Sequence, residues 1–299
     1  MNREDVLRAL QGVIPAVVTP MLENGTLDID GFEANLHAWN SLGLTGYLVL
    51  GSTGETPLLT EFEQGMLVQI ARRTVPHDRL LLVGTGRNST AATIEATLRA
   101  AEAGADAVLV VAPTYYTPQY TQSALRRHYE AVADASPVPV LLYNIPQFTH
   151  ITLSPALVAD LATHPNIVGI KDSSGAPASL LAIRRATPPT FRILNGSAVY
   201  ALGALLDGAA DGLILALANI APETCVALFN AARAGRIEEA RRFHSALLAL
   251  NEALAGTGIG GIKAGVEARG WAAGPSRPPL SPVDEAQRAR IAAAVAALP

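Results

Sequence analysis

The feature that most constrains the fold is an alternation, repeated eight times, of a short apolar run with a longer segment of helical periodicity. Most of the runs hold about four to eight consecutive apolar residues, which is the pattern of strands buried on both faces of a parallel sheet. We therefore predict eight strands, at residues 12–20, 46–52, 80–86, 107–113, 138–146, 166–172, 191–197 and 211–219.

The segments between the runs carry the signals of helix starts and helix ends. Residues whose side chains commonly cap a helix N-terminus precede four of them: Asp28, Thr60, Ser89 and Ser154. Several segments end in glycine, which is favoured just after a helix. Eight strand–helix units are complete by about residue 234, and this number predicts a (β/α)8 TIM barrel, because an open doubly wound sheet rarely needs so many.

The last part of the chain has helical periodicity but no further strand. We predict helices at about 236–255, 260–270 and 283–297, with a proline-rich turn before the last of them. No flexible linker separates this part from the barrel. We therefore expect residues 1–234 to form the barrel and residues 235–299 to form a C-terminal three-helix extension packed on it.

Composition limits the partners that we expect for the chain. The net charge of −4 offers no basic surface for nucleic acid or an anionic membrane, and no apolar stretch is long enough to cross a bilayer. Cys225 is the only cysteine, which fits a reducing compartment, and the N-terminus lacks the apolar centre of a signal peptide. We expect a soluble cytoplasmic protein that acts on a small molecule.

The chemistry of a (β/α)8 barrel lies at the C-terminal ends of its strands, so polar residues at those positions are the candidates for a site. They are Ser52, Thr53, Glu55, Tyr115, Tyr116, Tyr143, Asn144, Lys171, Asp172, Asn195, Ser197 and Asn219, and Gly196 lies among them after the seventh predicted strand. The histidines show no spacing typical of metal ligands, and few of these residues are carboxylates. We therefore predict no metal site.

Lys171 is the most informative of these residues, because it ends an apolar run and is one of only two lysines in the chain. Strict alternation would place it on one face with Ile167 and Gly169, and the glycine would leave room for a long side chain inside the barrel. Burial disfavours the charged ammonium, and a neutral amine can attack a ketone to form a Schiff base. The alternative is an ordinary lysine at a loop entrance.

Two neighbouring strand ends supply groups that suit such an amine. Tyr143 can move the protons that Schiff-base formation requires, or it can simply fill the mouth of the barrel. The segment GSTGE at 51–55 offers two hydroxyls and backbone N–H groups suited to a carboxylate, or it can be a plain tight turn. Asp172 reads as a turn residue.

Four motifs in chain order resemble a known family. GSTGE, PTYYTP, YNIP and GIKDSSG, at the ends of four predicted strands, look like the dihydrodipicolinate synthase/N-acetylneuraminate lyase family. The resemblance runs from about Gly12 to the C-terminus. It implies a (β/α)8 lyase that holds pyruvate as a Schiff base and needs no other cofactor.

The resemblance also implies a role for individual residues. The family's Schiff-base lysine matches Lys171, its proton-shuttling tyrosine matches Tyr143, and its carboxylate-binding hydroxyls match Ser52 and Thr53. Its second relay tyrosine, which a neighbouring subunit contributes, matches Tyr116. The substrates implied are pyruvate or another 2-oxo acid and an aldehyde, and the implied assembly is a homo-oligomer, either a dimer or a tetramer built as a dimer of dimers.

Departures from the family pattern indicate a branch. The arginine that grips aspartate semialdehyde in the synthases is replaced by Phe148, and a phenyl ring cannot pair with a carboxylate. Gly196 is followed by Ser197 and Ala198, where sialic acid lyases have acidic residues. We expect Phe148, Gly196 and Ser197 to contact the substrate.

The combination of LGSTGE, HPNIVGIKDSSG, NGSA, ALAN and GPSRPPL looks most similar to the branch of the family that contains the 4-hydroxy-2-oxoglutarate and 2-keto-3-deoxy-acid aldolases. The sequence therefore predicts a pyruvate aldolase acting on a 2-oxo-3-deoxy or 4-hydroxy-2-oxo acid. The alternative is 4-hydroxy-tetrahydrodipicolinate synthase, which condenses pyruvate with aspartate semialdehyde. Two further alternatives are weaker. A phosphosugar barrel needs a glycine-rich loop for the phosphate, and NGSA and ALANIAPET at the last two predicted strand ends together contain one glycine. A non-enzymatic sensor of 2-oxo acids would not need Lys171, Tyr143, Ser52 and Tyr116 together.

Overall fold

The computed structural model describes all 299 residues and contains eight parallel strands. They are β1 (Val13–Pro15), β2 (Gly46–Val49), β3 (Leu80–Gly84), β4 (Ala107–Val111), β5 (Val140–Asn144), β6 (Ile167–Asp172), β7 (Arg192–Asn195) and β8 (Gly212–Leu215). Each lies within a predicted run. Several are shorter than predicted at the C-terminal end, because the backbone there turns into a loop, as at Leu50, whose φ is 59°.

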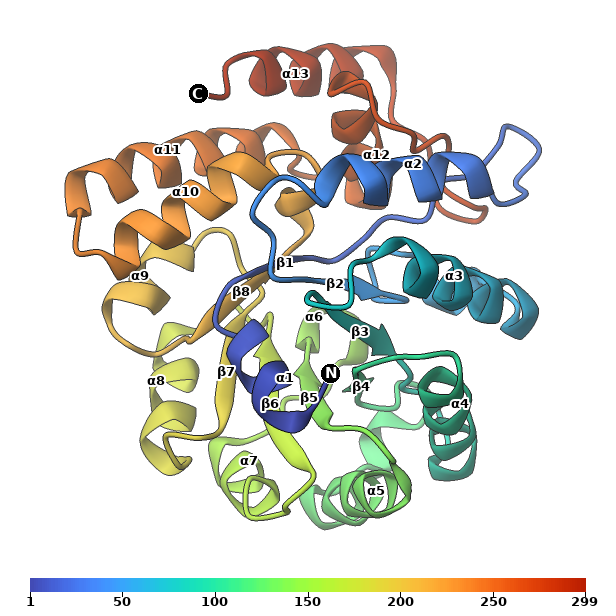
Figure 1. The fold of residues 1–299 in the computed structure, drawn as a ribbon, viewed down its shortest axis with the longest axis vertical. Helices are drawn as coiled ribbons and strands as arrows, with labels where there is room; N and C mark the ends of the chain where they lie inside the picture. The colour runs from blue at the N-terminus through green and yellow to red at the C-terminus, as the bar shows by residue number, and fades with distance from the viewer.

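The strands form a barrel (Figure 1). They follow the order β1-β8-β7-β6-β5-β4-β3-β2, and a parallel bridge between Ala16 and Leu48 joins the two ends of this series. The N–H of Val17 donates to the Leu48 carbonyl at 2.9 Å in the same place. The predicted (β/α)8 fold is confirmed.

Helices cover the outside of the barrel. They are α2 (Ile29–Trp39), α3 (Glu61–Thr74), α4 (Thr90–Glu102), α5 (Gln122–Ala135), α7 (Pro155–Leu161), α8 (Pro177–Ala186), α9 (Ala201–Leu206) and α10 (Pro222–Arg233). The four predicted N-caps are confirmed, since the side chains of Asp28, Thr60, Ser89 and Ser154 each accept a bond from an amide in the first turn. Thr60 and Glu63 form a full capping box.

An additional helix, α1 (Arg3–Ala9), closes the N-terminal mouth of the barrel (Figure 1). Its Val6, together with Leu10, belongs to a cluster of 16 buried residues that fills the barrel interior and includes Tyr143. A second cluster of 69 residues lies between the strands and the outer helices. Apolar side chains thus fill the barrel at the N-terminal ends of the strands, and the mouth at their C-terminal ends remains for polar groups.

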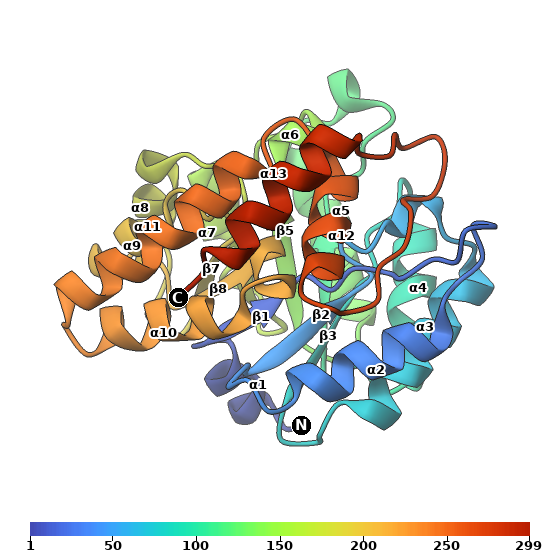
Figure 2. The same cartoon turned by 90° about the horizontal axis from the view of Figure 1, so that it is seen from above.

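Three more helices complete the chain, as predicted: α11 (Ile237–Ala253), α12 (Gly258–Ala268) and α13 (Glu285–Ala296). Figure 2 shows α13 lying along α11 and α12 on one side of the barrel. The segment 271–282, which we call the strap, runs from α12 to α13. Its Ala272 exchanges two hydrogen bonds with the Asn35 side chain, and its Ala273 carbonyl accepts from Met21 N–H at 2.9 Å.

The division of the chain into a barrel and an extension between residues 234 and 235 stays a prediction.

None of the helices is both long and apolar enough to cross a membrane.

Candidate active site

Lys171 and Tyr143 meet at the C-terminal ends of adjacent strands. The register of β5 and β6 places these two residues opposite each other. Lys171 Nζ donates a hydrogen bond of 3.2 Å to the Tyr143 hydroxyl and lies 4.3 Å from the centre of its ring. Each residue is 4% exposed. The sequence placed both at strand ends, and the structure brings them into direct contact.

The sequence predicted that Ile167 and Gly169 share a face with Lys171 and that Gly169 leaves room for its side chain. Two parts of this prediction are wrong. A β-bulge in the β5–β6 pairing puts Val168, rather than Ile167, into the interior cluster, because the extra residue breaks the strict alternation. Gly169 does share the face of Lys171, but a Cβ there would lie 2.4 Å from the Arg192 carbonyl oxygen. This glycine is required by the close approach of β7, and it makes no room for the lysine.

Gly196 is the glycine that leaves space beside the amine. A Cβ at this position would lie 3.2 Å from Lys171 Cε and 2.0 Å from Ser173 Oγ. The Gly196 N–H donates to the Asp172 carbonyl at 2.7 Å, which fixes the loop after β7 against the loop after β6. Ser197 follows on the same loop, and Asn195 holds it through bonds to both its N–H and its carbonyl.

Asp172 is the turn residue that the sequence indicated. One carboxylate oxygen accepts from the N–H and the hydroxyl of Ser174, and the other accepts from Asn144 Nδ2 at 2.8 Å. Asn144 in turn accepts from Leu153 N–H. This buried network fixes the ends of β5 and β6, and therefore the separation of Tyr143 from Lys171.

The GSTGE segment lies across the same mouth of the barrel. Ser52 and Tyr143 line one cavity of about 70 Å³, and Thr53 is buried beside Ser52. Two threonines hold the backbone of the segment: Thr19 donates to the Gly54 carbonyl at 2.7 Å, and Thr56 donates to the Gly51 carbonyl at 2.9 Å. The segment is therefore a fixed turn, and its Ser52 lines the same cavity as Tyr143.

Two predicted site residues lie farther out. Tyr116 is 57% exposed and stacks edge-on against Tyr115, with ring centres 4.9 Å apart. Phe148, in the short helix α6 (Pro146–Thr149) after β5, is 61% exposed. Neither side chain is among the groups that contact the Lys171 amine within the chain.

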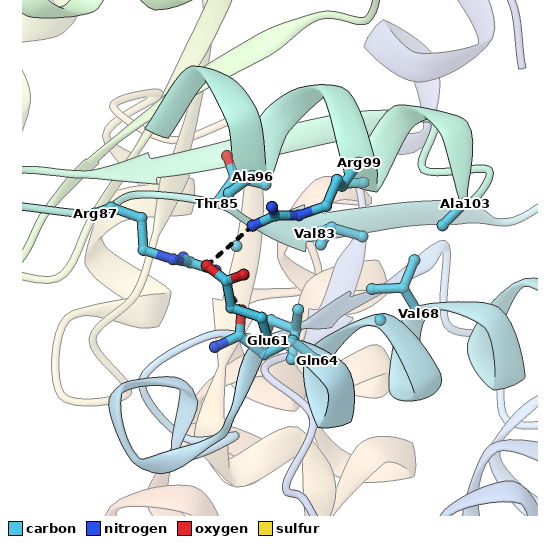
Figure 3. A pocket seen from close by; sticks show the side chains of 13 residues that line it. Glu61, Gln64, Val68, Val83, Thr85, Arg87, Ala96, Arg99 and Ala103 are labelled. Carbon is cyan, nitrogen blue, oxygen red and sulfur yellow. Dashed lines mark hydrogen bonds and ion pairs between the residues drawn. The ribbon is translucent and has the colours of Figure 1, made fainter. Parts of the chain in front are cut away.

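Arg87 is a residue that the sequence reasoning missed. It lines the cavity of Ser52 and Tyr143, and also a second cavity of about 60 Å³ between α3 and α4, which Figure 3 shows. Its guanidinium donates to the Gly86 carbonyl and to Gln64 Oε1, and burial lowers its pKa. A basic residue directly after the predicted strand 80–86 was the available signal.

The chain's other lysine, Lys263, is 1% exposed and pairs with Glu55. Burial alone therefore does not distinguish the two lysines. Lys171 differs in facing a phenol and a glycine at a strand end, whereas Lys263 faces a carboxylate. No group of three or more His, Cys, Asp and Glu side chains is arranged to hold a metal ion.

Known proteins match this chain over almost its whole length. The sequence model of the Dihydrodipicolinate synthetase family matches residues 9–298. A 4-hydroxy-tetrahydrodipicolinate synthase from Methanoculleus marisnigri is 37% identical over 289 residues, which cover 94% of this chain and 97% of that protein.

Two solved structures have the same architecture. Dihydrodipicolinate synthase DapA-2 from Bacillus anthracis superposes with a TM-score of 0.92 at 29% identity, covering 97% of this chain and 99% of the other. YagE from E. coli K12, a prophage protein of the dihydrodipicolinic acid synthase family solved in complex with pyruvate, gives a TM-score of 0.89 at 34% identity, covering 94% and 96%.

Proposed function

The chain belongs to the dihydrodipicolinate synthetase family, and from this membership we propose that Lys171 forms a Schiff base with C2 of pyruvate. Enzymes of the family are pyruvate-dependent carbon–carbon lyases of class I, which use a lysine and no metal, and this chain is one of them. The observation that supports Lys171 as the nucleophile is its contact with Tyr143, buried at adjacent strand ends.

The proposed reaction begins when the Lys171 amine attacks C2 of pyruvate to give a carbinolamine. The carbinolamine loses water, and the Tyr143 hydroxyl, 3.2 Å from the nitrogen, supplies the proton that leaves with it. Ser52 and Thr53 hold the pyruvate carboxylate through their hydroxyls. Loss of a proton from C3 then gives an enamine, whose C3 attacks the carbonyl carbon of an aldehyde, and hydrolysis releases the product and the free amine.

Two candidates remain for the aldehyde. Seven curated relatives, at 35–39% identity, bear the name 4-hydroxy-tetrahydrodipicolinate synthase, and by this comparison condensation with aspartate semialdehyde is the better supported. Phe148 favours the other candidate, because an apolar ring follows β5 where the synthase pattern has a cation for the second carboxylate. That candidate is the formation or cleavage of a 2-oxo-3-deoxy or 4-hydroxy-2-oxo acid.

The assembly and the location of the enzyme belong to the same proposal. We place Tyr116 in the active site of a neighbouring subunit, since its ring is exposed and lies away from Lys171 in its own chain. A dimer is the smallest assembly that meets this requirement. A cytoplasmic location is supported by the single cysteine, Cys225, which is buried and free.

One assay separates the two candidates. The purified enzyme is incubated with pyruvate and aspartate semialdehyde, and separately with a panel of 2-oxo-3-deoxy and 4-hydroxy-2-oxo acids whose cleavage releases pyruvate. If Phe148 lines the aldehyde site, cleavage of one of the acids is faster than consumption of aspartate semialdehyde. Rapid consumption of aspartate semialdehyde with no cleavage of the panel would identify a synthase.

A further inference from the structure

The GSTGE turn is connected to the C-terminal extension by a buried ion pair. Glu55, the last residue of the turn, places its carboxylate oxygen Oε1 2.6 Å from Nζ of Lys263 in α12. The two side chains are 0% and 1% exposed. These residues are 208 positions apart in the chain, as their numbers show, so the pair closes a long-range link between the barrel mouth and the extension.

The backbone of the turn needs such a link. Leu50 and Glu55 have φ values of 59° and 57°, a left-handed backbone conformation that residues other than glycine rarely adopt. These two residues lie on either side of Ser52 and Thr53 in the chain. Only one other non-glycine residue of the chain, His150, has a positive φ. Conformations of this kind persist where surrounding contacts fix them, and the Glu55 side chain supplies contacts at one end of the turn.

Each member of the ion pair also makes one hydrogen bond with the strap. The second Glu55 oxygen, Oε2, accepts from the Arg277 N–H at 2.7 Å, and Lys263 Nζ donates to the Pro275 carbonyl at 2.7 Å. A charge buried without its partner is strongly unfavourable, so neither group can leave while the other stays. The carboxylate therefore holds the turn, the strap and α12 in one arrangement.

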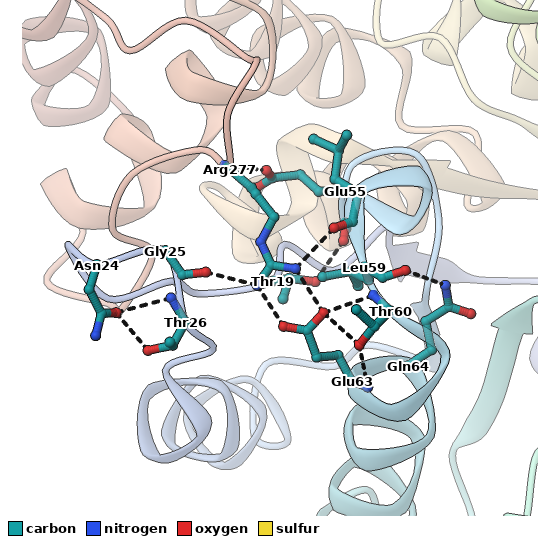
Figure 4. A network of polar contacts seen from close by, with 12 residues as sticks. Thr19, Asn24, Gly25, Thr26, Glu55, Leu59, Thr60, Glu63, Gln64 and Arg277 are labelled. Carbon is teal, nitrogen blue, oxygen red and sulfur yellow. Dashed lines mark hydrogen bonds and ion pairs between the residues drawn. The ribbon is translucent and has the colours of Figure 1, made fainter.

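The side chain of Arg277 extends the same network, as Figure 4 shows. Its guanidinium makes a two-pronged contact with Glu63 at 2.7 and 2.8 Å and also donates to the carbonyls of Leu58 and Gly25. These acceptors belong to the segment after the turn, to the first turn of α3 and to the loop before α2. The strap is thus anchored to three separate segments of the barrel.

From this arrangement we infer that Glu55 and Lys263 are positioning residues for pyruvate binding: their ion pair lets the C-terminal extension hold the Ser52 and Thr53 hydroxyls in place. This inference rests on the proposed function, because it takes these hydroxyls to bind the pyruvate carboxylate. Neither Glu55 nor Lys263 contacts Lys171, so the pair acts on binding and leaves the chemistry of the amine unchanged.

The test uses the full-length enzyme and the rate at which borohydride inactivates it at increasing pyruvate concentrations. Glu55→Gln keeps the size of the side chain and removes its charge. We expect the pyruvate concentration for half-maximal inactivation to rise at least about tenfold, the worth of one charged hydrogen bond, while the maximal rate changes less than about threefold. Arg288→Ala, which removes an exposed ion pair of the same extension, is the control and leaves both values unchanged.

A double variant separates positioning from simple stability. Glu55→Gln/Lys263→Met removes both buried charges, so its thermal midpoint recovers relative to Lys263→Met alone, but its half-saturating pyruvate concentration stays high because the tether is gone. If Lys263→Met alone does not fold, Glu55→Gln and the double variant decide the question.

The results that contradict this inference differ from the result that contradicts the proposed function. A folded Glu55→Gln enzyme with an unchanged half-saturating concentration would overturn the inference, as would a double variant whose pyruvate binding recovers together with its stability. Wild-type enzyme that forms no adduct at any pyruvate concentration would instead refute the proposed function.

Discussion

Lys171 Nζ and the Tyr143 hydroxyl lie 3.2 Å apart because the register of β5 and β6 sets the two residues side by side. The Asp172–Asn144 bond one residue farther along keeps the strand ends at this separation. An amine and a phenol in contact, with 4% of each residue exposed, form a pair that can exchange protons with little access to bulk water.

Removal of the phenol hydroxyl should slow catalysis without disturbing the fold. Tyr143→Phe keeps the ring that packs on the interior cluster, and we expect kcat to fall by roughly 10²–10⁴, the usual contribution of a positioned acid–base group. Tyr129→Phe is the matched control, since the Tyr129 hydroxyl is buried in α5 without a hydrogen-bond partner. A near-normal kcat for Tyr143→Phe, with circular dichroism unchanged, would mean that Tyr143 only packs.

Shared active sites should be detectable by mixing inactive subunits. Lys171→Ala and Tyr116→Phe enzymes are each expected to be inactive, because one lacks the amine and the other lacks the hydroxyl given to the neighbour. Mixed under conditions that allow subunit exchange, they should regain part of the activity through hybrid sites. Exchange shown by mass spectrometry without any regained activity would exclude a role for Tyr116 across an interface.

Most of the fold could be predicted from the sequence because short stretches of the chain specify its strands and helices. Continuous apolar runs and capping residues such as Thr60 and Ser89 specify strands and helices one at a time, and eight units leave few arrangements other than a barrel. The sequence did not reveal the bulge that moves Val168 inward, because a bulge depends on the pairing of two strands.

The candidate site was predicted less completely, for the same reason. Lys171 and Tyr143 were recognisable from their places at strand ends and from family motifs. The Glu55–Lys263 pair joins residues that are far apart in the chain, and no local pattern indicates such a contact. Arg87 likewise became a candidate only when the structure showed which cavities it lines.

Phe148 offers a test of which aldehyde is used. Phe148→Arg should increase turnover of aspartate semialdehyde, because a guanidinium on the exposed side of α6 can meet the second carboxylate. The same change should decrease turnover of the acid that the wild type cleaves. Steady-state kinetics with both substrates measure the change in preference. Efficient synthase activity in the unmodified enzyme would show that Phe148 does not decide specificity.

Acidification should weaken the anchor of the strap before it affects the barrel core. The bond from Arg277 lowers the pKa of Glu63 from 4.5 to about 2. Since the folded pKa lies below the unfolded one, the stabilisation is complete above pH 4.5 and is lost as the pH falls towards 2.

Urea unfolding of wild type and Glu63→Gln measures this pH dependence. The difference in unfolding free energy, about 1 kcal/mol for a pair still partly open to solvent, should be constant from pH 7 to 5 and shrink below that. Glu252→Gln, at an exposed position outside the ion pairs, is the control. A difference that stays constant down to pH 3 would contradict the assignment of the anchor to an ionised Glu63.

The Schiff base on Lys171 is tested most directly by trapping it. Incubation with pyruvate and borohydride, followed by peptide mass spectrometry, should give a single stable adduct on the peptide that contains Lys171 and complete loss of activity. Lys171→Ala and Lys171→Arg should both fail to form the adduct, because a guanidinium stays protonated and cannot attack the ketone. An adduct on Lys263, the other buried lysine, or no adduct in active wild-type enzyme, would contradict the mechanism.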